Sequence, residues 1–320
     1  MTGTESEAVV VKIGGARAVD PAGALADVAH LVANGTDVVV VHGGSTAVDD
    51  TLEALGEEPT YVETPGGVVG RFTDEATMDV FKMVMPGKLN TDLVEALQNE
   101  GVDAVGLSGV DGQLLAGKRK SAVRVKEDGK KKIKRGDHSG TIEDVNTDLL
   151  ETLITGGYVP VVGGPVLGAE SAEQSSADTS SGQRPRDHGG YTAVNADADR
   201  TAAAVAGALG ADLVLLTDVS GIYADPDNEG TKIDVAETPE ELAAVEDAAE
   251  GFMTKKVMAA TEALETGATS VVVADANAND PVTNALAGHG TTLAPGALGV
   301  DDDDADTAAT DADELEVSGQ

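Results

Sequence analysis

VVVKIGG, the stretch from Val9 to Gly15, has the pattern of a buried parallel strand that ends in a glycine turn. Three β-branched residues lead into Lys12, and the two glycines let backbone amides approach a ligand closely. A lysine at the end of a buried strand is unfavourable unless it meets negative charge. We therefore interpret Lys12, Gly14 and Gly15 as the start of a phosphate site. The alternative is a strand whose lysine extends to solvent and whose glycines precede a helix.

A second unit of the same kind follows directly. The spacing predicts a helix over Pro21 to Ala33, a buried strand over Asp37 to His42 and, after the turn at Gly43 and Gly44, a helix over Thr46 to Leu55. Two such units predict a parallel sheet whose glycine turns meet at the carboxyl edge, where ligands bind. Neither turn has GxGxxG spacing and GxxxxGK[ST] is absent, which disfavours a dinucleotide fold and a P-loop NTPase.

The composition bounds the environment and the partners. With 57 acidic and 21 basic residues, a net charge of −36 and 2% aromatics, the chain is typical of a soluble protein in concentrated salt. This charge disfavours nonspecific binding to nucleic acid or to an anionic membrane. The lack of cysteine excludes disulfides and cysteine-ligated metal, and we assign no residue as a metal ligand. Without a leader pattern or a long apolar run, we expect a cytoplasmic protein.

The rest of the chain continues the alternation of strands and helices. Helices are predicted over 74–84, 90–100, 148–154, an Ala-rich segment ending at 209 and 251–266, and strands over 102–107, 158–162, 213–216 and 271–273. The segments 281–287 and 291–293 are expected to close the fold. The segment 168–190 has hardly any apolar residue and is predicted to be an exposed or disordered loop. The acidic tail 301–320 is predicted to be disordered.

Three further positions are candidates for binding or chemistry. Arg71 follows a glycine-containing turn, and its planar guanidinium is suited to holding a carboxylate; the alternative is a surface ion pair. Asn195 and Asp199 are four residues apart at a predicted helix start, so we expect them on one helix face. Lys256 lies in GFMTKKV, also at the start of a helix.

The segment KRKSAVRVKEDGKKKIKR, Lys118 to Arg135, is the strongest anomaly in composition. It holds 10 of the 21 basic residues and its alternation around an EDG turn predicts a two-stranded hairpin that stands off the sheet. In so acidic a chain this basic patch indicates an acidic partner that makes contact ion pairs. The alternative is a charged edge that discourages strand pairing. The candidate docking residues are Lys118, Arg119, Lys120, Lys130, Lys131 and Lys132.

Phosphoryl transfer to a carboxylate fits this set of residues. The nucleophile, with a pKa near ~4.3, is already ionised at neutral pH and requires no general base. The difficulty is to bring two anions together and to stabilise the transferred group, which calls for lysines, glycine amides, an arginine and an orienting aspartate.

The motifs together resemble the amino acid kinase family, in its acetylglutamate kinase branch. They are VVVKIGGA, VVVVHGGS, GRFTD, VNADADRTAAAVAGALGADLVLLTDVSGIY and GFMTKKVMAATEAL. The resemblance implies a three-layer α/β sandwich with a mostly parallel sheet and two lobes, binding ATP and Mg²⁺. It implies catalytic roles for Lys12, Lys256 and Asp199, acceptor binding by Gly43, Gly44, Arg71 and Asn195, and nucleotide binding by Gly14, Gly15, Thr217, Asp218 and Tyr223.

Within this branch the chain is similar to the subgroup, of haloarchaeal type, that acts on glutamate or 2-aminoadipate attached to an amino-group carrier protein. The Pro-Gly-Gly insertion before Arg71, SGVDGQLLAGKRK and RGDHSGTIEDVN are similar to that subgroup, and Asp197 stands where the family usually has asparagine. The resemblance implies an acidic carrier protein as partner and a homodimer or larger oligomer. We expect residues 1–162 to bind the acceptor and 163–300 the nucleotide.

Two alternatives remain at this point. An ordinary N-acetylglutamate kinase would use the hairpin only as surface. A non-catalytic sensor could bind amino acid and nucleotide on the same fold, although Lys12 and Lys256 are both present.

Overall fold

The computed structural model describes residues 8–14, 20–65, 67, 69–127, 130–169, 190–225, 227–249 and 251–299. Gly15, most of the predicted loop 168–190 and the predicted disordered tail 301–320 therefore lie outside the described residues.

A central sheet runs through the molecule. Among the described residues it has eight strands in the order β15 (Val235–Ala236), β17 (Thr291–Leu293), β16 (Ser270–Asp275), β12 (Asp212–Thr217), β1 (Val9–Ile13), β2 (Val38–His42), β9 (Val159–Gly163) and β5 (Ala104–Ser108). Every neighbouring pair is parallel except β16 with β17. All residues of β1 and β2 are buried, as their continuous valine runs predict. The predicted, mostly parallel α/β fold is confirmed.

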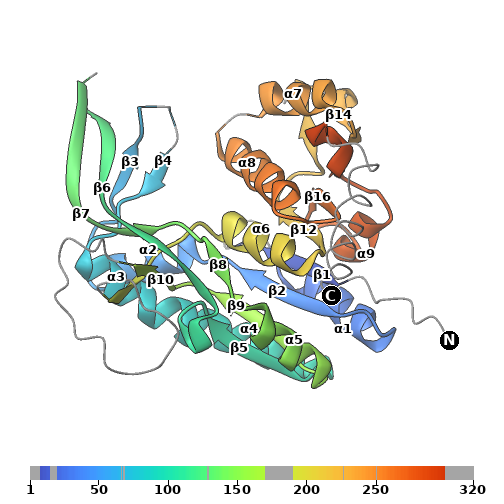
Figure 1. Cartoon of the computed structure of the whole chain (residues 1–320), viewed down its shortest axis with the longest axis horizontal. Helices are drawn as coiled ribbons and strands as arrows, with labels where there is room; N and C mark the ends of the chain where they lie inside the picture. The colour runs from blue at the N-terminus through green and yellow to red at the C-terminus, as the bar shows by residue number, and fades with distance from the viewer. Residues whose placement is uncertain are drawn as a thin grey trace, which may run out of the picture.

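Helices cover both faces of this sheet (Figure 1). Val9 and Val11 of β1 pack on one face with residues of α1, α4 and α9. Val10 packs on the other face with residues of α5, α6, α7 and α8. The α-helices are α1 (Ala22–Ala33), α2 (Ser45–Ala54), α3 (Glu75–Met83), α4 (Asn90–Asn99), α5 (Thr147–Thr155), α6 (Ala198–Leu209), α7 (Pro239–Ala248), α8 (Phe252–Glu265) and α9 (Pro281–Leu286). The molecule therefore has three layers.

The predicted basic hairpin is present and is longer than expected. It consists of β6 (Leu115–Glu127) and β7 (Lys130–Gly140), which pair antiparallel and rise above the central sheet in Figure 1. A second sheet joins it through β10 (Val166–Ala169) and β11 (Tyr191–Val194), with β8 (Asp144–Val145) on β6. Two short ribbons complete the part of the fold that the structure describes, β3 (Tyr61–Glu63) with β4 (Val69–Arg71) and β13 (Ile222–Tyr223) with β14 (Lys232–Ile233).

The structure differs from the predicted elements in three places. The loop predicted from residue 168 begins too early, because Gly168 and Ala169 belong to β10, which pairs with β6 and β11. The helices predicted over 74–84 and 90–100 are joined by a π-helical segment, Val84–Leu89, although it contains Pro86. Helix α7 was not predicted, yet Thr238 and Glu241 form a capping box at its start, a signal readable in the sequence.

The predicted boundary between residues 162 and 163 does not divide the central sheet. Strand β12, from the second half of the chain, pairs directly with β1 from the first half. Within the described residues no helix has the length and apolar character needed to cross a membrane.

Candidate active site

Three charged side chains meet inside the protein at the carboxyl end of β1. Lys12 lies in β1, Asp199 in the first turn of α6 and Lys256 near the start of α8. The Lys12 Nζ is 2.7 Å from one Asp199 carboxylate oxygen, and the Lys256 Nζ is 3.1 Å from the other. Their exposed fractions are only 6%, 9% and 8%. The carboxylate therefore offsets the mutual repulsion of two ammonium groups that are buried side by side.

The electrostatics of this triad differ from those of surface groups. Burial alone would raise the pKa of the Asp199 carboxyl, but the adjacent Lys12 and Lys256 outweigh burial and hold the pKa at about 2. Burial, together with the nearby Lys12 charge, lowers the pKa of Lys256 below its usual range. Two cations balanced by one anion leave a positive site, which is suited to attract phosphate oxygens.

The glycine turn after β2 lies next to this triad. The Gly43 N–H donates to the Ile13 carbonyl at 3.2 Å, so the ends of β1 and β2 are tied together. Gly44 precedes α2, and a Cβ placed there would meet Leu89 Cδ1 at 2.2 Å and Met85 Sδ at 2.5 Å. Packing therefore favours glycine at position 44.

His42, which was not assigned a role from the sequence, lies buried beside this turn. Its ring nitrogens lie 3.2 Å from the Asn90 side-chain amide and 3.3 Å from the Gly43 carbonyl oxygen. Burial lowers its pKa to about 4, so the imidazole is neutral at neutral pH. Its position before two glycines was the available signal. What it contacts depends on α4, which the local sequence does not reveal.

Arg71 makes an internal ion pair in this structure. Its guanidinium contacts the Asp49 carboxylate and donates to the Ser45 carbonyl at 2.9 Å and to the Tyr61 hydroxyl at 3.0 Å. The Tyr61 hydroxyl in turn donates to Asp49 at 2.8 Å. Arg71 is thus held against the first turn of α2, directly after Gly43 and Gly44, and the carboxylate that it holds here belongs to the protein.

Asn195 joins the same region from another direction. Its side-chain amide donates to the Thr73 hydroxyl at 3.0 Å, two residues after Arg71. The expectation that Asn195 and Asp199 share one helix face is wrong, because α6 begins only at Ala198 with Asp197 as its N-cap. The Asp197 carboxylate accepts from two backbone N–H groups of the first turn, so the helix starts after Asp197 and does not include Asn195.

The candidate nucleotide residues lie at the same edge of the sheet. Because Lys12 is in register with Leu215, the turn at Gly14 and the end of β12 at Thr217 are neighbours. Thr217 is buried and donates to the Asp218 carboxylate, which is exposed. Tyr223 is half-buried in β13 and pairs with Lys232. Gly15 lies outside the described residues.

The candidate docking lysines are largely exposed, whereas Arg119 is not. Lys118, Lys120, Lys130, Lys131 and Lys132 are exposed. Arg119 is half-buried at the base of the hairpin, 3.2 Å from a ring nitrogen of His138. The exposed isoleucine Ile133, at 65%, lies among the basic residues of β7.

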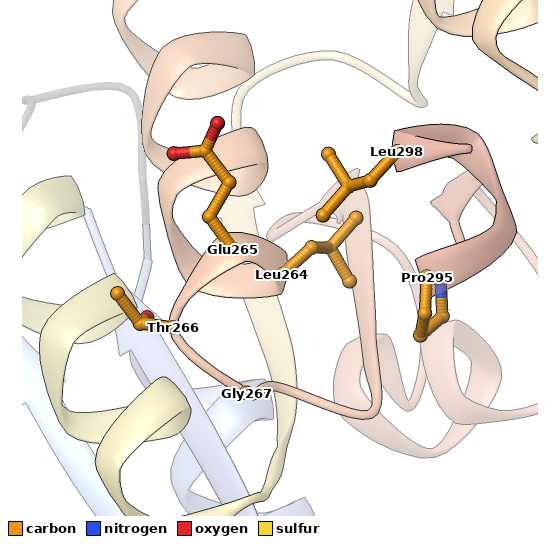
Figure 2. Close-up of a pocket in the computed structure, with 6 residues that line it drawn as sticks. All are labelled: Leu264, Glu265, Thr266, Gly267, Pro295 and Leu298. Carbon is orange, nitrogen blue, oxygen red and sulfur yellow. The ribbon is translucent and has the colours of Figure 1, made fainter. Parts of the chain in front are cut away.

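Figure 2 shows a pocket at the opposite end of α8 from Lys256. It lies between the last turn of α8 and the 3₁₀ turn Pro295–Leu298, and Leu264, Pro295 and Leu298 line it. No lysine or arginine is among its lining residues, so it is not suited to hold two anionic reactants. In the part of the chain that the structure describes, no cluster of three or more His, Cys, Asp or Glu residues could hold a metal ion.

Comparison with known proteins gives consistent matches. The family described as "Amino acid kinase family" matches residues 7–275. The chain is 40% identical to a LysW-aminoadipate kinase of Thermus thermophilus over 291 residues, covering 89% of this chain and 99% of that protein. It is 41% identical to the enzyme of that name from Deinococcus radiodurans, with 89% and 91% covered. It is 37% identical to an acetylglutamate kinase of Methanopyrus kandleri, with 82% and 93% covered.

Solved structures agree on the fold. Carbamate kinase of Giardia superimposes with a TM-score of 0.60 at 17% identity, covering 91% of this chain and 99% of that one. N-acetylglutamate synthase of Neisseria gonorrhoeae gives a TM-score of 0.67 at 23% identity, with 90% and 59% covered. At these identities the likeness concerns the fold alone.

Proposed function

The chain belongs to the amino acid kinase family, and we propose that it is an ATP-dependent kinase that phosphorylates the side-chain carboxylate of a carrier-bound amino acid. The acceptor is L-glutamate or L-2-aminoadipate on an amino-group carrier protein, and the product is an acyl phosphate for arginine or lysine biosynthesis. The observation that carries the proposal is the buried Lys12–Asp199–Lys256 triad in a chain 40% identical to a LysW-aminoadipate kinase.

The reaction needs charge stabilisation more than proton transfer. A carboxylate oxygen of the acceptor attacks the γ-phosphorus of ATP, the bond from that phosphorus to the bridging oxygen breaks, and ADP leaves. Lys12 and Lys256 stabilise the negative charge on the transferred group, and Asp199 keeps the two ammonium groups in position. No general base is required, because the acceptor carboxylate is ionised at neutral pH.

The remaining candidate residues would bind the reactants. Gly43, Gly44, Arg71 and Asn195 would hold the acceptor, while Gly14, Gly15, Thr217, Asp218 and Tyr223 would hold the nucleotide. Mg²⁺ would neutralise charge on the ATP phosphates, and it requires few protein ligands when phosphates supply the rest. Asp218 is the exposed carboxylate near the end of β12 that could contribute to it.

The hairpin would dock the carrier protein. Exposed lysines at its tip and Ile133 among them offer basic and apolar contacts on a chain whose net charge is −36. Relatives named for LysW, among them those of Thermus thermophilus and Deinococcus radiodurans, support a carrier as partner. Arg119 is half-buried on His138 and so would support the base of the hairpin more than it would contact a partner.

The second candidate function is an N-acetyl-L-glutamate 5-kinase. The acetylglutamate kinase of Methanopyrus kandleri, 37% identical, favours this alternative. A sensor without catalysis is disfavoured by the intact triad of Lys12, Asp199 and Lys256.

The deciding experiment compares acceptors. ATP turnover of the full chain is measured in concentrated KCl with free N-acetylglutamate and with glutamate and aminoadipate each linked to the carrier, and the acyl phosphate is trapped with hydroxylamine. We expect activity on a carrier conjugate, and the preferred conjugate identifies the pathway. Equal or better activity on free N-acetylglutamate would overturn the carrier assignment.

A pair of variants tests the hairpin as a docking surface. Lys130→Gln with Lys131→Gln removes two exposed charges at the tip, and Lys82→Gln with Lys88→Gln removes two exposed charges on α3 and the π-helical segment. We expect the tip variant alone to raise the KM for the carrier conjugate roughly tenfold, since contact ion pairs persist in concentrated salt. Equal effects of the two variants would contradict a specific docking surface.

Three further properties are proposed with this function. The homodimer or larger oligomer can be tested by light scattering, and the cytoplasmic location by fractionation of the source cells. The large negative charge supports function in concentrated salt, which the salt dependence of folding tests. We also propose that residues 1–162 contribute mainly acceptor contacts and 163–300 mainly nucleotide contacts.

A further inference from the structure

Asp137 is a fully buried carboxylate without a role in the chemistry described above. It lies near the end of β7 with 0% of its surface exposed. One carboxylate oxygen accepts from the Thr73 N–H at 3.1 Å. The other accepts from the Ser139 N–H at 3.2 Å and from the Ser139 hydroxyl. A buried carboxylate is unfavourable unless such donors satisfy it, so this arrangement is specific.

Thr73, which Asp137 holds, is also the residue that Asn195 contacts. The Thr73 hydroxyl accepts from the Asn195 side-chain amide at 3.0 Å, and the Thr73 carbonyl accepts from the His138 N–H at 2.7 Å. Asn195 is fixed to the same strand by its backbone. Its N–H donates to the His138 carbonyl at 2.8 Å, and its carbonyl accepts from the Gly140 N–H at 2.9 Å.

These contacts join three parts of the protein. Thr73 comes two residues after Arg71, Asn195 lies four residues before Asp199, and β7 continues into the basic hairpin. We propose that Asp137 is a positioning residue for the acyl acceptor, which by holding Thr73 against the return strand of the hairpin keeps Asn195 in the orientation that binds the acceptor. This inference rests on the proposed function, because it takes Asn195 as an acceptor-binding residue.

Asp27 offers a matched control elsewhere in the fold. It is also buried, at 5% exposed, and its carboxylate accepts from the N–H groups of Val282 and Thr283 at 2.7 and 3.0 Å. It joins α1 to α9, and none of these residues belongs to the proposed site. Asp27→Asn therefore removes the charge of a buried carboxylate that likewise accepts backbone hydrogen bonds, and it leaves the acceptor contacts unchanged.

The experiment measures acceptor and ATP kinetics separately. For Asp137→Asn in the full chain we expect the KM for the preferred acceptor to rise roughly tenfold, which is the size of effect expected from losing one charge-assisted hydrogen bond. The KM for ATP should stay within about twofold of wild type. Asp27→Asn should lower the melting temperature and leave both KM values unchanged. If Asp137→Asn changes both KM values or neither, Asp137 has only a structural role and the proposal is overturned.

Thr73→Val keeps the inference testable if Asp137→Asn does not fold. It removes the hydroxyl that Asn195 contacts while preserving shape, and Thr73 is itself fully buried. We expect the same selective rise in acceptor KM, and a smaller than additive effect when it is combined with Asp137→Asn. An unchanged acceptor KM contradicts the proposal.

The same assays separate this inference from the proposed function. If wild type acts only on free N-acetylglutamate, the carrier assignment fails and the KM comparison is made with that acceptor. If wild type acts on the carrier conjugate and the variants show no selective effect, the inference alone fails. A wild-type chain inactive on every acceptor contradicts both.

Discussion

Lys12, Asp199 and Lys256 illustrate at the scale of single residues how buried charges depend on one another. Each is nearly inaccessible, and each charge is acceptable in the interior only because the others are present. Two ammonium groups share one carboxylate, so the triad carries a net positive charge that the negative charge of a bound phosphate can balance.

Replacing one lysine should reduce catalysis much more than stability. For Lys256→Met we expect kcat to fall by roughly 10³-fold, because the transition state loses one buried cation. Lys12→Met should have a similar effect. Lys255→Met, which removes a half-buried charge one position earlier in α8, is the matched control. Single-turnover measurements with trapped acyl phosphate give these rates, and an unchanged rate in Lys256→Met would falsify the site assignment.

Removing the carboxylate should instead reduce stability. Asp199→Asn leaves the Lys12 and Lys256 ammonium groups buried without their anion. We expect a loss of about 3–5 kcal/mol in the free energy of unfolding. Chemical denaturation in concentrated KCl measures it. If the free energy of unfolding falls by less than it does for an ordinary surface substitution, Asp199 does not form the two ion pairs described here.

His42 should make stability depend on acid. Its pKa is about 4 in the folded protein and near 6.5 in the unfolded chain, so above about pH 7 the imidazole is neutral in both states. As pH falls from 7 to 4 the unfolded state binds a proton that the folded state does not, and folding becomes less favourable by about 3 kcal/mol. Unfolding curves of wild type and His42→Gln should therefore converge with acid, and His30→Gln on α1 controls for losing a histidine. Parallel pH profiles would contradict this.

At the scale of elements, the packing of α6 on α8 positions the triad. Asp199 is in the first turn of α6 and Lys256 lies near the start of α8. The helices approach closely at their other ends, where a Cβ on Gly207 would lie 1.9 Å from the Thr266 hydroxyl and 3.1 Å from its backbone carbon. The glycine therefore allows the separation at which both charged groups reach each other.

Gly207→Ala should destabilise the protein although it is a favourable helix substitution elsewhere. Forcing a methyl group into this contact should cost about 1–3 kcal/mol of unfolding free energy. Gly87→Ala is the control, because Gly87 lies in a helical segment and a Cβ there meets nothing within 4 Å. Denaturant midpoints measure both, and equal behaviour of the two variants would show that α6 and α8 can separate freely.

At the scale of the whole molecule, the large negative net charge makes stability depend on salt. A net charge of −36 on 320 residues makes the compact state repel itself, and salt screens this repulsion. The three-layer fold contributes a large buried core, whose apolar burial opposes the repulsion.

The melting temperature should therefore rise with KCl between low and molar concentration at neutral pH. The rise should be smaller near about pH 4, where carboxylates lose much of their charge. Calorimetry at both pH values measures the difference. A salt dependence that is the same at both would assign the effect to apolar burial, which salt also strengthens.

The sequence by itself determined the parts that depend on local pattern. Valine runs in β1 and β2 predicted buried parallel strands, and the glycines after them marked the edge where Lys12 lies. The basic alternation of 118–135 predicted the hairpin. These predictions held because side-chain periodicity and turn chemistry act within a few residues.

The tertiary structure decided which distant groups meet. Arg71 holds Asp49, Asn195 lies outside the helix that carries Asp199, and Asp137 holds Thr73 from 64 residues away. None of these contacts can be read from the local sequence, because the partners meet only after strands and helices from different parts of the chain have packed together. The chemistry could thus be anticipated from motifs, whereas the geometry that positions its reactants is a property of the folded molecule.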